Sequence, residues 1–216
     1  MSPPQRPRVL LADDHRMVAE GLRSLLSPEF DLLEVVEDGR SLLDAAARLH
    51  PDVIVADISM PHLNGLDALV QLRRHDPGVK VVLLTMHAEV AYARRALSEG
   101  ALGYVLKHAA PAELLSAIRA ALRGQTYITP TLAGGVFQSM REGGGQAKEP
   151  GAALTPRQRE ILQLLAEGRS AKEVAAALGI SARTVEFHKY QMMDTLQVRT
   201  SAELVHFALK HGISPL

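Results

Sequence analysis

The chain contains no cysteine and no tryptophan among its 216 residues, and only 4% of its residues are aromatic. The absence of cysteine excludes disulfides, thiol catalysis and thiolate metal sites. Because aromatic residues are so scarce, the core must be built from Leu, Val, Ile and Ala. No apolar run approaches the roughly 18 residues of a membrane span, and residues 1–8 lack the apolar stretch of a signal peptide. We expect a cytoplasmic protein that makes no contact with a membrane.

The chain also lacks net charge, with 24 basic and 24 acidic residues. No overall positive field therefore indicates a nucleic-acid partner. The two halves differ slightly, because residues 1–123 carry 14 basic and 16 acidic residues, whereas residues 153–216 carry 8 and 6. This difference has the sign expected for a nucleic-acid-binding second half, but it is too small to decide the matter.

A stretch rich in glycine, GGGQAKEPG at residues 143–151, separates two halves with different hydrophobic patterns. Such a composition buries little apolar surface and is typical of a flexible linker. We expect a first domain over residues 7–123 and a second over residues 153–216. Residues 124–152 are then a linker with a possible helix at 129–141.

The first half alternates apolar runs with amphipathic segments. The runs are short, β-branched and nearly continuous, which predicts strands buried on both faces. These strands are expected at residues 9–12, 32–36, 53–56, 81–84 and 104–106. Helices are expected between and after them, at residues 15–26, 41–49, 66–74, 90–98 and 112–122. Strict alternation of strands and helices implies a five-stranded parallel sheet with helices on both faces.

Polar side chains follow the strands of this predicted sheet. Because ligands bind outside the carboxyl ends of parallel strands, these side chains are candidates for one site. They are Asp13, Asp14, Asp57, Thr85 and Lys107. Crowded carboxylates favour a hard cation with oxygen ligands, which suggests Mg²⁺. A carboxylate can also act as a nucleophile and form an aspartyl-phosphate, with the metal and Lys107 neutralising charge and Thr85 donating to a phosphoryl oxygen.

Each of these residues also has a simpler explanation. An Asp after a strand can merely cap the next helix, and a Lys there can be solvated. We favour a site because all five residues occupy the correct strand ends. A phosphatase remains an alternative, but such an enzyme usually needs a second carboxylate two residues after the nucleophile, where this chain has Ser59.

The motifs VLLADDH (9–15), VIVADISMPHLNGLD (53–67), LLTMH (83–87) and GYVLKHA (103–109) resemble the receiver domain of bacterial two-component response regulators. The resemblance implies a flavodoxin-like, doubly wound sheet with strand order 2-1-3-4-5. It also implies that a sensor histidine kinase phosphorylates Asp57, and that the protein is not an enzyme beyond its own phosphotransfer and dephosphorylation. Mg²⁺ would be bound by Asp14, Asp57 and the Ser59 carbonyl, and by Asp13 through water. Tyr104 matches the aromatic switch position, although it can also be an ordinary strand aromatic packed on a helix.

The second half has no strand pattern and several helix start signals. Three Ser or Thr residues are each followed three residues later by Glu or Gln, which predicts capping boxes at Thr155, Ser170 and Thr200. Ser181 is a further expected N-cap. The resulting helices cover residues 156–167, 171–178, 182–196 and 201–211. The second and third of them have helix-turn-helix spacing, in which the later helix enters the major groove of DNA.

The sequence 154–213 resembles the LuxR-type helix-turn-helix domain, most specifically in LTPRQREIL, ISARTVEFH and AELV. Together with the receiver motifs, it indicates the NarL/FixJ class of response regulators. The resemblance implies double-stranded promoter DNA and RNA polymerase as partners and a homodimer on activation. The expected base-facing residues are Glu186, Phe187 and Tyr190, and the expected phosphate contacts are Lys172, Arg183, Thr184, Lys189 and Arg199. Any single Lys or Arg among them can instead be part of a solvated helix face.

One departure from the LuxR-type pattern concerns the end of the predicted recognition helix. Gln197 stands where glycine is common, which suggests a different helix ending, and Thr195 stands where lysine is common.

A second interpretation of the whole chain also stays open at this point. The protein can be a constitutive DNA-binding protein whose receiver serves only for dimerisation, although the intact acidic set argues against it.

Overall fold

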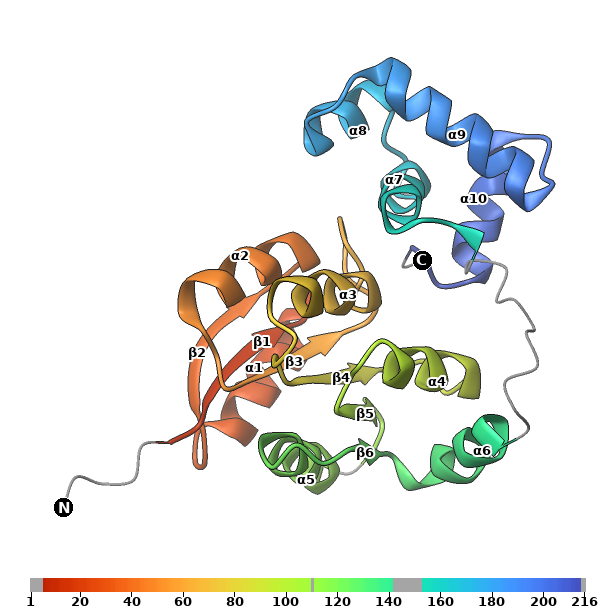
Figure 1. The fold of residues 1–216 in the computed structure, drawn as a ribbon. Helices are drawn as coiled ribbons and strands as arrows, with labels where there is room; N and C mark the ends of the chain where they lie inside the picture. The colour runs from red at the N-terminus through yellow and green to blue at the C-terminus, as the bar shows by residue number, and fades with distance from the viewer. Residues whose placement is uncertain (1–5, 110, 142–152, 215–216) are drawn as a thin grey trace.

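The computed structural model describes residues 6–109, 111–141 and 153–214. Its first part is a parallel sheet covered by helices on both faces, and its second part is a helical bundle (Figure 1). The strands are β1 (Arg8–Ala12), β2 (Asp31–Val36), β3 (Val53–Asp57), β4 (Val81–Thr85), β5 (Gly103–Leu106) and β6 (Tyr127–Ile128). The helices of the first part are α1 (Arg16–Leu26), α2 (Gly39–Leu49), α3 (Gly65–His75), α4 (Val90–Ser98), α5 (Pro111–Leu122) and α6 (Pro130–Arg141).

The strand order is β2-β1-β3-β4-β5-β6, so the predicted order 2-1-3-4-5 is confirmed and a sixth strand is added. The sixth strand, β6, pairs in parallel with β5 and lies in the stretch expected to be linker. It contains only two residues, which is too short to give a recognisable apolar run. The expectation of exactly five strands was therefore wrong by one edge strand.

Side chains of successive strand residues face opposite sides of the sheet. Val9 and Leu11 of β1 lie in the core with α1 and α5, whereas Leu10 and Ala12 lie in the core with α2, α3 and α4. All four are buried. The continuous apolar runs of the sequence are thus explained, because both faces of the sheet are covered by helices.

The helix expected near residues 129–141 is present as α6. Its side chains Leu132 and Val136 are buried in the same core as Ala93 and Ala96 of α4. In Figure 1, α6 lies beside α4 at the edge of the sheet that carries β6. The chain from Tyr127 to Arg141 therefore packs on the first domain.

The second part consists of α7 (Pro156–Ala166), α8 (Ala171–Leu178), α9 (Ala182–Leu196) and α10 (Ser201–Lys210). Capping boxes begin α7 at Thr155 and α8 at Ser170, as expected, and the Ser181 side chain caps α9. The third expected box is incomplete. Thr200 accepts a bond from the Glu203 backbone N–H, but the Glu203 carboxylate accepts from the Arg199 backbone N–H at 2.8 Å rather than from Thr200.

The ending of α9 also differs from the expectation. Gln197 adopts the left-handed conformation, with φ of 56°, that glycine adopts most easily at this position. Its side-chain Nε2 donates to the Asp194 carbonyl at 2.7 Å, which helps to hold this conformation. The helix therefore ends in the usual way without glycine, and the suggestion of a different ending was wrong.

Candidate functional site: an acidic pocket and an exposed recognition helix

The carboxyl ends of β1, β3, β4 and β5 bring the predicted acidic set together. Asp57 is the last residue of β3, Thr85 is the last residue of β4, and Asp13 and Lys107 each follow the end of a strand. Asp13, Asp57 and Thr85 are buried, with exposed fractions of at most 3%. Carboxylates are seldom buried without a partner, so their burial here points to a functional or structural pairing.

Lys107 joins two of the carboxylates. Its ammonium Nζ lies 2.7 Å from Asp57 Oδ2 and 2.8 Å from Asp13 Oδ2, and the side chain is only 10% exposed. A lysine held in this way can neutralise charge that develops on a group attached to Asp57.

The titration of this pair reflects its surroundings. Burial raises the pKa of the Asp57 carboxyl above its usual value, and the nearby Asp13 charge adds to the rise, while the bond from Lys107 opposes it. Burial alone would lower the pKa of the Lys107 ammonium, but its bonds to Asp13 and Asp57 outweigh burial and raise it. Lys107 therefore stays protonated, and an ionised Asp57 is more basic than an ordinary aspartate.

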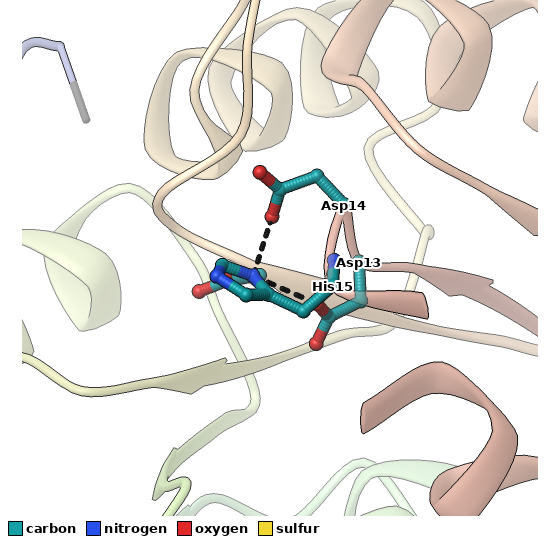
Figure 2. A group of neighbouring side chains, drawn as sticks. Asp13, Asp14 and His15 are labelled. Carbon is teal, nitrogen blue, oxygen red and sulfur yellow. Dashed lines mark hydrogen bonds and ion pairs between the residues drawn. The ribbon is translucent and has the colours of Figure 1, made fainter. Parts of the chain in front are cut away.

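Asp14 and His15 extend the pocket towards solvent. His15 Nδ1 lies 2.8 Å from Asp14 Oδ1 and 3.5 Å from Asp13 Oδ1 (Figure 2). One ligand atom from each of Asp13, Asp14, His15 and Asp57 can be chosen so that all lie within 4.8 Å of one another. This set can hold a metal ion, and its three carboxylates suit a hard cation. Sequence reasoning missed His15, although it directly follows the two aspartates.

Ser59, Thr85 and Tyr104 lie around the same pocket, and each of them forms a hydrogen bond with His87. The His87 backbone N–H donates to Thr85 Oγ1 at 3.1 Å, and the His87 ring Nε2 lies 3.1 Å from Ser59 Oγ. The Tyr104 side chain is buried, and its hydroxyl donates to the His87 carbonyl at 2.9 Å. The polar tip of Tyr104 therefore points inward in this structure, and His87 is more than an ordinary loop residue.

The helix α9 presents the predicted recognition surface. Val185 and Met192 face the core of the helical domain. Phe187 and Tyr190 face outward with 58% and 64% of their surfaces exposed, which is unusual for large aromatic residues. The Lys189 ammonium lies 2.6 Å from the Glu186 carboxylate, so that these two side chains are not independent. Lys172 near the start of α8, Arg183 near the start of α9 and Arg199 after α9 are exposed.

A polar stripe on α7 docks against the loop that follows Asp57. The Gln163 side chain is fully buried, and its Oε1 accepts from the Asn64 backbone N–H at 2.8 Å. Its Nε2 donates to the Met60 carbonyl at 2.8 Å. One turn further along the chain, Glu167 directly after α7 accepts from the His62 backbone N–H at 2.8 Å. Three backbone groups between Asp57 and α3 are therefore bonded to the helical domain.

A buried charge cluster strengthens the same contact. Asp67 of α3 is 2% exposed, and its Oδ1 lies 3.0 Å from Arg95 Nη2 of α4 and 2.9 Å from Arg159 Nε of α7. Burial lowers the pKa of the Arg159 guanidinium, and the Asp67 charge opposes that effect. Arg40 of α2 also pairs with Glu160 of α7. Sequence reasoning missed these residues, because a polar helix face gives no sign of the surface that it contacts.

Comparisons with known proteins agree with this geometry. The response regulator receiver domain family matches residues 9–119, and the family of bacterial regulatory proteins of the luxR type matches residues 152–208. The transcriptional regulatory protein MctR of Rhizobium johnstonii is 38% identical over 214 residues, which cover 97% of each chain. The response regulator UvrY of Escherichia coli K12 is 34% identical over 95% of this chain and 94% of that one.

Solved structures give the same relationship. A LuxR-family response regulator from Aurantimonas is 32% identical, with a TM-score of 0.61 over 63% of this chain and 99% of that one. RcsB of Salmonella enterica serovar Typhimurium, bound to the promoter P1flhDC with the phosphomimetic BeF3⁻, is 27% identical, with a TM-score of 0.63 over 95% and 100% of the two chains.

Among the helices of the described residues, none is long and apolar enough to cross a membrane. The acidic pocket around Asp57 is the phosphorylation site of a receiver domain, and the helical domain is of the DNA-binding luxR type. The chain therefore belongs to the NarL/FixJ family of two-component response regulators, which are transcription regulators and not enzymes.

Proposed function

We propose that this protein is a promoter-binding switch in which a phosphoryl group on Asp57, taken from a sensor histidine kinase, frees the helical domain from the receiver domain. The observation that carries the proposal is the direct contact between the loop after Asp57 and α7. A change at the acceptor can reach the helical domain through only a few residues of chain.

We assign the pocket residues as follows. Asp57 is the acceptor, Lys107 bonds the phosphoryl group, and Thr85 turns its hydroxyl towards that group. Asp13, Asp14, Asp57 and the Ser59 carbonyl would hold Mg²⁺, which would neutralise phosphoryl oxygens when bound. The three carboxylates within reach of one another support this ligand set. His15 offers a nitrogen beside it, which Mg²⁺ does not prefer.

The docked arrangement would restrain the helical domain without covering its reading surface. Phe187 and Tyr190 remain exposed while α7 is docked. Two recognition helices must however lie about one turn of DNA apart to read paired half-sites. Release from the receiver domain would allow two helical domains to take that spacing in a homodimer. The relative RcsB has been solved as two dimers bound to two parallel DNAs.

We assign sequence reading to the outer face of α9. Glu186 can accept a bond from cytosine N4, and Phe187 can contact a thymine methyl group, as can the Tyr190 ring. Lys172, Arg183, Thr184, Lys189 and Arg199 would contact phosphates and fix the register. RNA polymerase would be the partner at the promoter. With promoter DNA and RNA polymerase as its partners, the protein would act in the cytoplasm.

Labelling by a phosphodonor tests the acceptor assignment. The wild-type protein and Asp57→Asn are incubated with radiolabelled acetyl phosphate and Mg²⁺, and covalent label is counted after gel filtration. We expect label on the wild-type protein and none on the variant. Equal labelling of both would contradict the assignment. The alternative of a constitutive DNA-binding protein predicts labelling without any change in promoter affinity, which a gel-shift measurement on the same samples decides.

A further inference from the structure

The loop after β4 connects the phosphorylation pocket to a second contact between the domains. His87, two residues after Thr85, makes three hydrogen bonds. Its backbone N–H donates to Thr85 Oγ1, its ring Nε2 bonds to Ser59 Oγ, and its carbonyl accepts from the Tyr104 hydroxyl. The position of His87 is therefore fixed by three side chains that surround the pocket. Any movement of the Thr85 hydroxyl must alter at least one of these bonds.

The His87 ring contacts α4, so the position of His87 is coupled to that helix. It stacks on the ring of Tyr92 with a centroid distance of 4.6 Å and an interplanar angle of 17°. Stacking of this kind prefers a narrow range of offsets and distances. A shift of His87 therefore favours a corresponding shift of the Tyr92 ring.

The Tyr92 hydroxyl reaches the helical domain at the turn after α10. A Cβ atom added to Gly212 would overlap the Tyr92 hydroxyl and would lie 2.8 Å from Tyr92 Cζ. Gly212 also has a φ of 55°, which favours glycine. The neighbouring Ile213 carbonyl accepts from Asn64 Nδ2 at 3.2 Å, so the same turn also touches the loop after Asp57. The ring of Tyr92 and the backbone of Gly212 thus leave no room between them.

We propose that His87 and Tyr92 form a positioning link that couples the state of the Asp57 pocket to the docking of the helical domain, with Gly212 as its contact point. The inference rests on the proposed function and names a route for it. When Thr85 turns towards a phosphoryl group, its bond from the His87 backbone is lost. His87 and the stacked Tyr92 then move, and the tight contact at Gly212 converts that movement into separation of the domains.

Gly212→Ala tests the contact without any phosphodonor. The added methyl group should force the turn away from Tyr92 and separate the domains. Alanine at a positive φ carries its own cost, so Gly179→Ala is the matched control. Gly179 has a φ of 64° and has nothing within 4 Å of an added Cβ atom. The double variant Gly212→Ala with Tyr92→Leu removes the overlapping hydroxyl and should restore docking.

Separation is measured as an interspin distance distribution. Because the chain has no cysteine, labels can be attached at Ser24→Cys on α1 and Thr195→Cys on α9, both at exposed positions. We expect the ratio of separated to docked molecules to rise at least tenfold in Gly212→Ala, to stay unchanged in Gly179→Ala, and to return towards the wild-type ratio in the double variant. An unchanged ratio in Gly212→Ala, or an equal rise in Gly179→Ala, would overturn the proposal.

Tyr92→Leu alone tests whether the pocket is coupled to domain docking, and it remains informative if Gly212→Ala does not fold. Tyr92 lies outside the set of residues assigned to phosphoryl transfer, so labelling from acetyl phosphate should be unchanged. The separation induced by BeF3⁻ with Mg²⁺ should fall to half of the wild-type response or less. A full response in Tyr92→Leu would overturn the link while leaving the proposed function intact. No response to BeF3⁻ in the wild-type protein would instead contradict the proposed function.

Discussion

The buried Gln163 side chain gives the sharpest test of the docked arrangement. Replacement by alanine would leave the Asn64 N–H and the Met60 carbonyl without their partners in the interface. Each buried group that loses its partner costs about 1–3 kcal/mol. If the domains stayed docked, the two groups together would cost about 2–6 kcal/mol. Separation exposes both groups to water and avoids this cost, so we expect Gln163→Ala to favour the separated state.

The size of the shift follows from these values. At about 1.4 kcal/mol for each factor of ten, a loss of about 2–6 kcal/mol raises the ratio of separated to docked molecules about 30-fold to 20,000-fold. The interspin distance between labels at positions 24 and 195 measures this ratio. Gln191→Ala, an exposed glutamine on α9, is the control. An unchanged distance distribution in Gln163→Ala would mean that these buried bonds do not hold the domains together.

Three further results are expected. First, metal affinity should weaken as pH falls, because burial raises the pKa of Asp57 and the metal binds only the ionised carboxylate. Affinity should be full above the pKa of folded Asp57 and lost below it, and this loss should begin at a higher pH than for a carboxyl of the ordinary pKa of 3.8; calorimetric titration with Mg²⁺ over a pH series measures it. Second, Asp57→Asn should raise the free energy of unfolding at neutral pH without metal, because burial raises the pKa of Asp57 and so disfavours its ionised form in the fold. An unchanged or lower thermal midpoint would contradict this. Third, Phe187→Ala should weaken binding to the promoter about 5- to 100-fold with little effect on random DNA. Lys172→Ala should weaken binding to both DNAs and reduce the slope of log affinity against log salt concentration by about 1. Gel shifts at several salt concentrations separate the two effects.

The sequence was sufficient to predict the sheet and the pocket for a clear physical reason. Buried parallel strands need continuous apolar runs, and the residues that end those runs must meet at one edge of the sheet. The positions of Asp57, Thr85 and Lys107 follow from that rule alone. Helix starts such as Thr155 and Ser170 were also predictable, because the capping residue and its partner are only three positions apart.

The contacts between the domains could not be predicted in the same way. Arg159, Glu160 and Gln163 form a polar face on α7, and such a face normally lies in water. Their burial depends on partners about 100 or more residues away in the chain, for example Asn64 for Gln163. The two-residue strand β6 was missed for a related reason, because its pairing with β5 and not its own composition makes it a strand.

If the docked arrangement works as a switch, phosphorylation of Asp57 controls DNA binding by this protein. Promoter affinity of the wild-type protein and of Asp57→Asn, measured by gel shift at one fixed salt concentration with and without acetyl phosphate and Mg²⁺, tests it most directly. We expect tighter binding by the phosphorylated wild-type protein and no response in Asp57→Asn. Equal affinity of the wild-type protein in both conditions, with Asp57 shown to be labelled, would contradict it.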